Sequence, residues 1–299
     1  MQLTGLHLLM TYQCLLECDH CFVWGSPAQR GTMTSAAIRQ ILEQTQEIKT
    51  LKWIYFEGGE PFLYYATLHK GVQLAAFMGF QVGIVSNGYW ATSFDDALTV
   101  LKPFQGLVQN LSISSDLFHW EKAISHQSEY ALAAAEELDI PAGVISIAGL
   151  ESLFDCQAKG KLESGESQVM FRGRAAVKLA PRAPHISWDS CTTCPYEDLV
   201  EPGRLHLDPD GNLHVCQGIC IGNLFERPLR DIVESYDPHT HPITGPLLEG
   251  GPMGLVLKYQ VPHRETYADA CHLCYEARLA LRERFPRLLG PDPIYGVGL

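Results

Sequence analysis

Three cysteines lie close together in the stretch "YQCLLECDHCF": Cys14, Cys18 and Cys21. Thiolates at such short spacing can bind a metal ion or an iron–sulfur cluster. A [4Fe–4S] cubane normally has four Cys ligands, so three would leave one iron open to a ligand from outside the chain. The alternative is a zinc site whose fourth ligand lies elsewhere or is His20. His20 directly precedes Cys21 and would have difficulty in reaching the same metal.

Polar and glycine residues follow the next apolar runs of the chain. "FEGGEPF" places Gly58, Gly59 and Glu60 where the second run ends. Bare glycine backbone lets a ligand approach closely, and a carboxylate beside it suits a bound ammonium group. Taken alone, such a segment is more often only a turn. Further polar residues follow or end the third and fourth runs: Ser86, Asn87, Ser112, Ser114 and Asp116. Each of these, taken singly, is more commonly a turn former or a helix cap.

Alternating apolar runs and helical patterns would position these residues. Runs typical of strands cover 6–11, 53–56, 82–85, 107–114 and 143–148, with a weaker sixth at 168–173. Helical patterns lie between them, including one with Thr34 as N-cap and an Ala- and Glu-rich one over 119–138. Such alternation predicts a parallel sheet with right-handed crossovers, in an α/β fold that is a partial (β/α)6 barrel. The chemistry is then expected at the carboxyl ends of the strands.

The pattern changes after residue 176, so we expect two domains, residues 1–176 and 177–299. Residues 180–190 are proline-rich and are typical of a surface linker, and 237–262 are typical of an irregular loop. A hairpin is predicted over 205–215 around an Asp-Pro-Asp-Gly turn. Helices are predicted at 228–236 and 265–284. The second domain is therefore expected to be a small cysteine-rich unit of hairpin and helix.

Composition excludes several classes of protein. The 299 residues carry a net charge of −12 and no basic runs with interleaved aromatic residues, so nucleic acid is not an expected partner. No stretch approaches the ~20 apolar residues of a membrane span, and no export signal is visible. We therefore expect a cytoplasmic protein without a membrane partner. In that setting, ten cysteines indicate metal or redox chemistry rather than disulfides.

Together, these motifs resemble those of the radical S-adenosylmethionine superfamily. The chain has a CxxxCxxC loop with the aromatic residue His20 before its last Cys, a Gly-Gly-Glu motif at 58–60, and a Ser-Asn-Gly turn after the third run. The resemblance covers about residues 1–176. It implies that the three cysteines hold a [4Fe–4S] cluster, whose open iron is chelated by the amine and carboxylate of S-adenosyl-L-methionine.

The resemblance also implies an activity and roles for other residues. The reduced cluster cleaves S-adenosylmethionine to a 5′-deoxyadenosyl radical, which abstracts a substrate hydrogen; the electron would come from a donor such as flavodoxin or ferredoxin. Glu60 would bind the methionine amine, and Ile145 would flank the adenine. The polar residues expected around the methionine carboxylate and ribose are Ser86, Asn87, Ser112 and Ser114. No catalytic residue is assigned, and the candidates are Asp116, His119 and Cys156.

The C-terminal part is similar to the SPASM and twitch subgroup, which carries auxiliary iron–sulfur clusters. The similarity rests on "FRGRA", "CTTC", "GNLHVC" and "IGNL". Two cubanes would need eight cysteines, so we expect one auxiliary [4Fe–4S] cluster; a structural zinc ribbon is the alternative. The candidate ligands are Cys191, Cys194, Cys216, Cys271 and Cys274, one of which would be spare, whereas Cys220 is the weakest candidate.

The resemblance leaves the substrate open. Many relatives modify peptides or proteins by oxidation, cross-linking or epimerisation, and this is the predicted function. A radical S-adenosylmethionine dehydrogenase of small molecules is the first alternative, and a non-catalytic metal-binding scaffold is the second. Gln217 stands where sulfatase-maturing members have an Asp base, which disfavours formylglycine formation.

Overall fold

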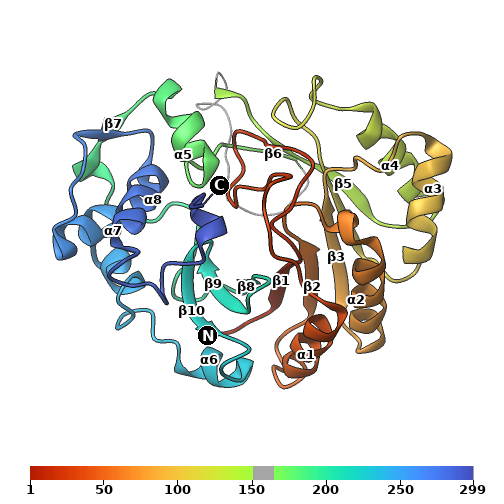
Figure 1. Ribbon diagram of the computed structural model, residues 1–299, viewed down its shortest axis with the longest axis horizontal. Coiled ribbons are helices and arrows are strands. Elements are labelled where there is room, and N and C mark those ends of the chain that lie inside the picture. Colours follow the sequence, from red (N-terminus) through yellow and green to blue (C-terminus); the bar gives the residue numbers. More distant parts are fainter. Residues whose placement is uncertain (151–164, 299) are drawn as a thin grey trace.

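A nine-stranded sheet forms the centre of the protein, in a computed structural model that describes residues 1–150 and 165–298 (Figure 1). Its strand order is β10-β9-β8-β1-β2-β3-β4-β5-β6. The strands are β1 Gly5–Leu9, β2 Trp53–Glu57, β3 Gln81–Ser86, β4 Asn110–Ser114, β5 Ala142–Ile147, β6 Gly165–Ser167, β8 Arg204–Leu207, β9 Asn212–Cys216 and β10 Ile219–Asn223.

Strands β1 to β6 are all parallel, and helices follow the first four of them, as the alternating pattern predicts. The helices are α1 Ser35–Thr45, α2 Tyr65–Phe77 after the short η1 Pro61–Tyr64, α3 Phe94–Leu101 with η2 Lys102–Phe104, and α4 His126–Glu137. Thr34 caps α1, because its hydroxyl accepts a hydrogen bond from the Ala37 N–H at 3.1 Å. The weak sixth strand lies earlier than predicted, at 165–167 rather than 168–173.

The two faces of the sheet differ in polarity. On β1, Leu6 and Leu8 pack into the main hydrophobic core, as do Ile54 and Phe56 on β2. The alternate residue His7 lies on the other face, where the curved sheet surrounds a cavity. This alternation buries apolar side chains against the helices and leaves polar ones facing inward.

The C-terminal part adds strands to the same sheet. Strand β8 pairs in parallel with β1, with Gly5 opposite Arg204 and Leu8 opposite Leu207. Strands β8 and β9 form the predicted antiparallel hairpin, and β10 extends it. The division into two domains at residue 176 stays a prediction. The structure adds that the chain returns to the β1 edge after leaving β6.

The remaining elements complete this part of the chain. They are α5 Arg174–Lys178, η4 Ala180–Arg182, β7 Ile186–Ser187, η5 Trp188–Ser190, α6 Leu229–Ser235, α7 Thr244–Tyr259, β11 Thr266–Tyr267, α8 Ala270–Leu281 and η6 Asp292–Tyr295. Figure 1 shows α7, α8 and β7 on the side of the hairpin away from β1, with α6 below the hairpin. The predicted helices at 228–236 and 265–284 correspond to α6 and α8. Among the described helices, none is long and apolar enough to cross a bilayer.

Two predictions for this part were wrong. Residues 237–262 contain α7 and are not an irregular loop; the helix is kinked at Gly250 and Gly251, whose backbone is not helical, and Pro252 opens its second half. At the first position of a helix, the backbone N–H has no partner within the helix, so a proline there loses no hydrogen bond. Proline can therefore begin a helix as well as end one. Residues 180–190 are not a plain linker, since β7 pairs with β11.

Leu207→Ala tests the contribution of the β8–β1 seam to stability. Leu207 is fully buried opposite Leu8, so the substitution is expected to lower the free energy of unfolding by about 2–5 kcal/mol. Leu257→Ala is the matched control, because that side chain is 58% exposed and its loss should change stability by less than about 0.5 kcal/mol. Anaerobic urea unfolding measures both, and equal effects would contradict a stabilising seam.

Candidate functional site

One large cavity opens at the carboxyl ends of the parallel strands. Cys14, Cys18 and Cys21 line it, on the loop that follows β1. Predicted cofactor-binding residues also line it, from the ends of β2 to β5: Gly58, Gly59, Ser86, Asn87, Ser114 and Ile145. The structure therefore gathers most of the predicted site residues around one space, as the parallel topology requires.

The cysteine loop is held by buried polar contacts. The guanidinium of Arg174 donates to the carbonyl oxygens of Cys18 at 2.9 Å and Gly25 at 2.8 Å. The backbone N–H of Gly25 donates to the Cys21 sulfur at 3.2 Å. Burial raises the pKa of the Cys14 thiol to about 11, and it also raises that of Cys18. Cysteines bind iron as thiolates, and burial disfavours that charged form. A positively charged iron centre would stabilise the thiolates.

The two glycines of the Gly-Gly-Glu motif allow the β2 end to contact the cysteine loop. Gly58 has a φ of +139°, and a Cβ atom on Gly59 would lie 1.9 Å from the carbonyl oxygen of Gln13. The Gly59 N–H donates to the Thr11 carbonyl at 2.7 Å, and the Glu60 N–H donates to that of Gln13 at 2.8 Å. Only glycine fits this close approach, which fixes the motif against the loop that carries the cysteines.

Glu60 is fully buried, and its carboxylate accepts hydrogen bonds from protein donors. Oε1 accepts from the Ser86 hydroxyl at 2.9 Å and the Phe62 N–H at 3.0 Å, while Oε2 accepts from the Asn87 N–H at 2.8 Å. Burial raises its pKa to about 7 even though these hydrogen bonds lower it. The structure thus shows Glu60 joining the ends of β2 and β3. Direct contact with the methionine amine stays a prediction.

The other predicted residues divide into those at the cavity and those elsewhere. Asp116 and His119 line it, with His119 Nδ1 and Asp116 Oδ1 2.8 Å apart, and Asp116 Oδ2 accepts from the Ile147 N–H at 3.0 Å. Ser112 is buried, and its hydroxyl donates to the Asn110 side chain at 3.0 Å rather than facing the cavity. Cys156 lies outside the described residues.

Four of the C-terminal cysteines surround a second, smaller cavity: Cys194, Cys216, Cys271 and Cys274. Four thiolates can hold either a [4Fe–4S] cluster or the zinc ion of the alternative interpretation, so both stay predictions. Cys191 does not line this cavity, and its sulfur lies 3.9 Å from the Ser187 carbonyl. This position favours Cys191 as the spare member of the predicted five, and the ligand set stays a prediction.

Two buried arginines accompany the four cysteines. Arg172 lies between the two cavities and lines both, and it donates to the Cys216 sulfur and to Glu197 Oε1, each at 3.2 Å. Burial opposes the charge of Arg172, but Cys216 and Glu197 outweigh it and raise its pKa. Arg278, from α8, is also buried and donates to the Gln217 carbonyl at 2.8 Å. A [4Fe–4S]²⁺ core with four thiolates carries a charge of about −2, which two such cations would compensate.

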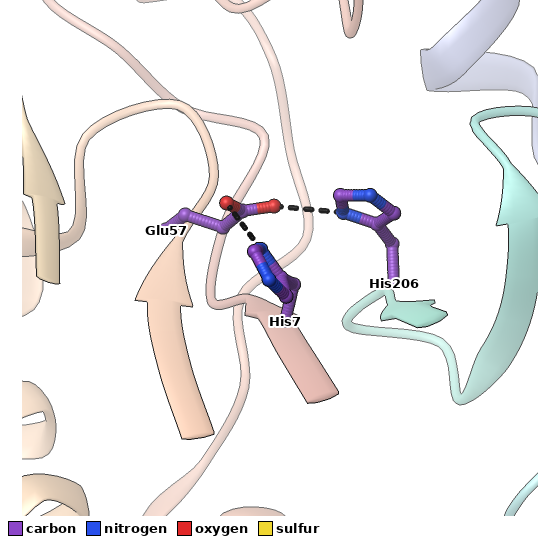
Figure 2. A group of neighbouring side chains, drawn as sticks. All are labelled: His7, Glu57 and His206. Atoms are coloured by element: carbon purple, nitrogen blue, oxygen red, sulfur yellow. Dashed lines mark hydrogen bonds and ion pairs between the residues drawn. The ribbon is translucent and has the colours of Figure 1, made fainter. Parts of the chain in front are cut away.

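Sequence reasoning missed one polar cluster on the inner face of the sheet. Figure 2 shows Glu57, the last residue of β2, between His7 of β1 and His206 of β8. The signal was present, because each histidine interrupts an otherwise apolar strand in the same Leu-His-Leu sequence. A polar side chain at an alternate position of a strand indicates the face opposite the core. Arg172 was also missed, within a segment interpreted as a strand.

Comparisons with known proteins agree with this geometry. The chain matches no protein-family profile. It is 32% identical over 108 residues to YydG of Bacillus subtilis (strain 168), a protein named for peptide biosynthesis. The matched residues make up 36% of this chain and 34% of that protein. It is 27% identical over 115 residues to the S-adenosylmethionine-dependent nucleotide dehydratase of Fibrobacter sp. (strain UWH6), again 36% of this chain and 32% of the relative. These matches span about a third of the length of each relative.

Solved structures share the fold. The S-adenosylmethionine-bound structure of anSMEcpe superposes with a TM-score of 0.54 at 11% identity, over 96% of this chain and 98% of that one. The structure of Streptococcus suis SuiB bound to S-adenosylmethionine gives 0.50 at 13% identity, over 79% and 67%. The predicted fold is thereby confirmed. The similarity to proteins that depend on or bind S-adenosylmethionine agrees with the resemblance to radical S-adenosylmethionine enzymes that the motifs carry.

Glu60→Gln is expected to weaken S-adenosylmethionine binding about tenfold or more, because a hydrogen bond to a charged group contributes ~1.5–3 kcal/mol. A glutamine side chain retains one oxygen and cannot accept from all three donors, so the Asn87 backbone should shift. Titration calorimetry on the cluster-loaded protein measures the dissociation constant, with the exposed Glu136→Gln as control. An unchanged constant in a variant with its cluster intact would contradict the role.

Arg172→Gln is expected to lower the reduction potential of an auxiliary cluster by about 60 mV or more, a tenfold change in a one-electron equilibrium. Reduction adds negative charge, and the variant removes the cation that contacts a ligand sulfur. Spectroelectrochemistry on a background with Cys14, Cys18 and Cys21 replaced by Ala would observe this cluster alone. Arg172→Lys and the exposed Arg287→Gln should stay near the parent value; a potential that is the same in all three would contradict the proposal.

Proposed function

We propose that the protein binds a [4Fe–4S] cluster and S-adenosylmethionine in the main cavity and modifies a peptide by radical chemistry. When bound, this pair supplies a 5′-deoxyadenosyl radical that abstracts a substrate hydrogen. Cys14, Cys18 and Cys21 would ligate the cluster. The observation that carries the proposal is their position in one cavity with the Gly-Gly-Glu motif and the polar ends of β3 and β4.

A peptide substrate is supported by two polar atoms at the other end of the cavity. Within the described residues, the Nε of Arg172 and the Oε1 of Gln217 are buried without a hydrogen-bond partner, and both side chains line the cavity. Buried polar atoms without a partner are costly. A peptide group offers the complementary acceptor and donor, so a bound backbone would satisfy both once these side chains turn their closed-off atoms toward the cavity. The similarity to a protein named for peptide biosynthesis points the same way.

The cysteines at 194, 216, 271 and 274 would ligate one auxiliary [4Fe–4S] cluster. Four Cys ligands complete a cubane, which favours electron transfer over direct substrate binding. Arg172 contacts the Cys216 sulfur and lines the main cavity, so it connects the two sites. A flavodoxin or ferredoxin would supply the reducing electron to the first cluster.

The assignment of the two cysteine sets is tested by iron counting and product analysis. Reconstituted wild-type protein is expected to hold roughly eight irons and to form 5′-deoxyadenosine with S-adenosylmethionine and dithionite. Replacing Cys14, Cys18 and Cys21 together by Ala should leave roughly four irons and abolish that product. Cys191→Ala is the matched control and should keep both iron and activity. Undiminished product in the triple variant would exclude the assignment.

The substrate class is tested by a separate experiment. Short peptides encoded beside the gene, deuterated at carbon, would be compared with deuterated free amino acids and small alcohols. Deuterium transferred to 5′-deoxyadenosine from a peptide alone supports the proposal. Transfer from a small alcohol alone would favour the dehydrogenase alternative, and Gln217→Ala should reduce transfer from peptide without changing the iron content.

A further inference from the structure

We propose that His7, Glu57 and His206 form a binding site for a divalent transition-metal ion, either Zn²⁺ or Fe²⁺, separate from both cysteine sites. The nitrogen and oxygen atoms of the three side chains gather within 4.8 Å of one another (Figure 2). The Nδ1 of His7 lies 3.0 Å from Glu57 Oε2, and the Nδ1 of His206 lies 2.9 Å from Oε1. The site does not depend on cleavage of S-adenosylmethionine.

The three ligands lie on rigid neighbouring strands. His7 and His206 are directly paired across β1 and β8, and Glu57 ends β2 on the other side of β1. Glu57 is paired with Leu9, two residues beyond His7, so its carboxylate reaches His7 diagonally on the same face of the sheet. Sites built on strands hold their geometry better than sites built on loops, which a coordination shell requires.

The ligand types match a known chemistry. Two imidazoles and one carboxylate bind zinc in catalytic sites and iron in non-haem ferrous sites, and both leave coordination positions open. The two N···O distances are those of ordinary hydrogen bonds, so the support for a metal is the convergence of these three ligand types at one point. Metal binding would displace the protons that the two Nδ1 atoms share with Glu57.

Charge and burial favour an ion at this position. All three side chains are at most 8% exposed, and a buried carboxylate needs a nearby positive charge. The ring of His7 stacks on Tyr55 at 4.6 Å, which restrains its orientation. Glu57 and His206 line the main cavity, so the open positions of a bound metal would face the space proposed for the substrate. A metal-free network of hydrogen bonds is the competing interpretation.

Zinc binding is measured on cluster-loaded protein after anaerobic dialysis against Zn²⁺. We expect about one equivalent per chain, with X-ray absorption showing nitrogen and oxygen neighbours at about 2.0–2.1 Å. Sulfur neighbours at about 2.3 Å would mean binding to cysteines and would overturn the site. The ferrous arm uses ⁵⁷Fe²⁺ and Mössbauer spectra, in which one high-spin ferrous signal separate from the clusters is expected. Absence of both metals overturns the proposal.

His206→Gln, His7→Gln and Glu57→Gln should each reduce bound zinc at least tenfold. The matched control is His126→Gln, which removes the histidine of an exposed pair with Glu129, also at 3.0 Å, and should keep the full equivalent. Cluster iron counted in the same samples reports whether each variant is folded, and it separates failure of this site from failure of the cysteine assignments. Zinc retained in all three folded variants would overturn the site.

Discussion

The parallel pairing of β1 with β2 on one side and β8 on the other is the constraint on which the functional geometry depends. It places β1 inside the sheet, with Leu8 opposite Phe56 and Leu207. The end of β1 is fixed as well, because the Met10 N–H donates to the Glu57 carbonyl at 2.8 Å. The loop that carries the first three cysteines therefore starts from a rigid point. The same strand contributes His7 to the inner face.

Buried cations offset the cost of gathering thiolates inside an acidic chain. Arg172, Arg174 and Arg278 are each at most 5% exposed, and they contact a cysteine sulfur or the carbonyl groups of nearby loops. Arg172 pairs with Glu197, and ionised cysteines would place further negative charge beside these buried guanidiniums. Cluster assembly and folding should thus be coupled in this protein, as they are in other metal-dependent folds.

The sequence predicts what depends on local pattern, and it fails where tertiary contact decides. Strand and helix periods predicted the parallel units. The glycines of the 58–60 motif were expected to admit a ligand, whereas the structure packs the backbone of Thr11 and Gln13 against them. The parallel pairing of β8 with β1 was missed, because the local sequence of a hairpin does not indicate which distant strand it will pair with. Ser112 was expected at the site with the other polar residues of β4; its hydroxyl bonds to Asn110 on the same strand, and contact with a cofactor stays a prediction. The choice of Cys191 as spare likewise needs the packing of α8.

A buried polar network explains why Cys220 stands apart from the other C-terminal cysteines. Its sulfur lies 3.5 Å from His214 Nδ1 and 3.3 Å from the Gly290 carbonyl, and His214 Nε2 lies 3.1 Å from Asp208. Although burial lowers the pKa of His214, Cys220 and Asp208 raise it to about 10. Asp208 also accepts from the Tyr12 hydroxyl at 3.1 Å, and Tyr12 lies two residues before Cys14. The hairpin that carries Cys216 is therefore joined by Asp208 and Tyr12 to the loop that carries Cys14.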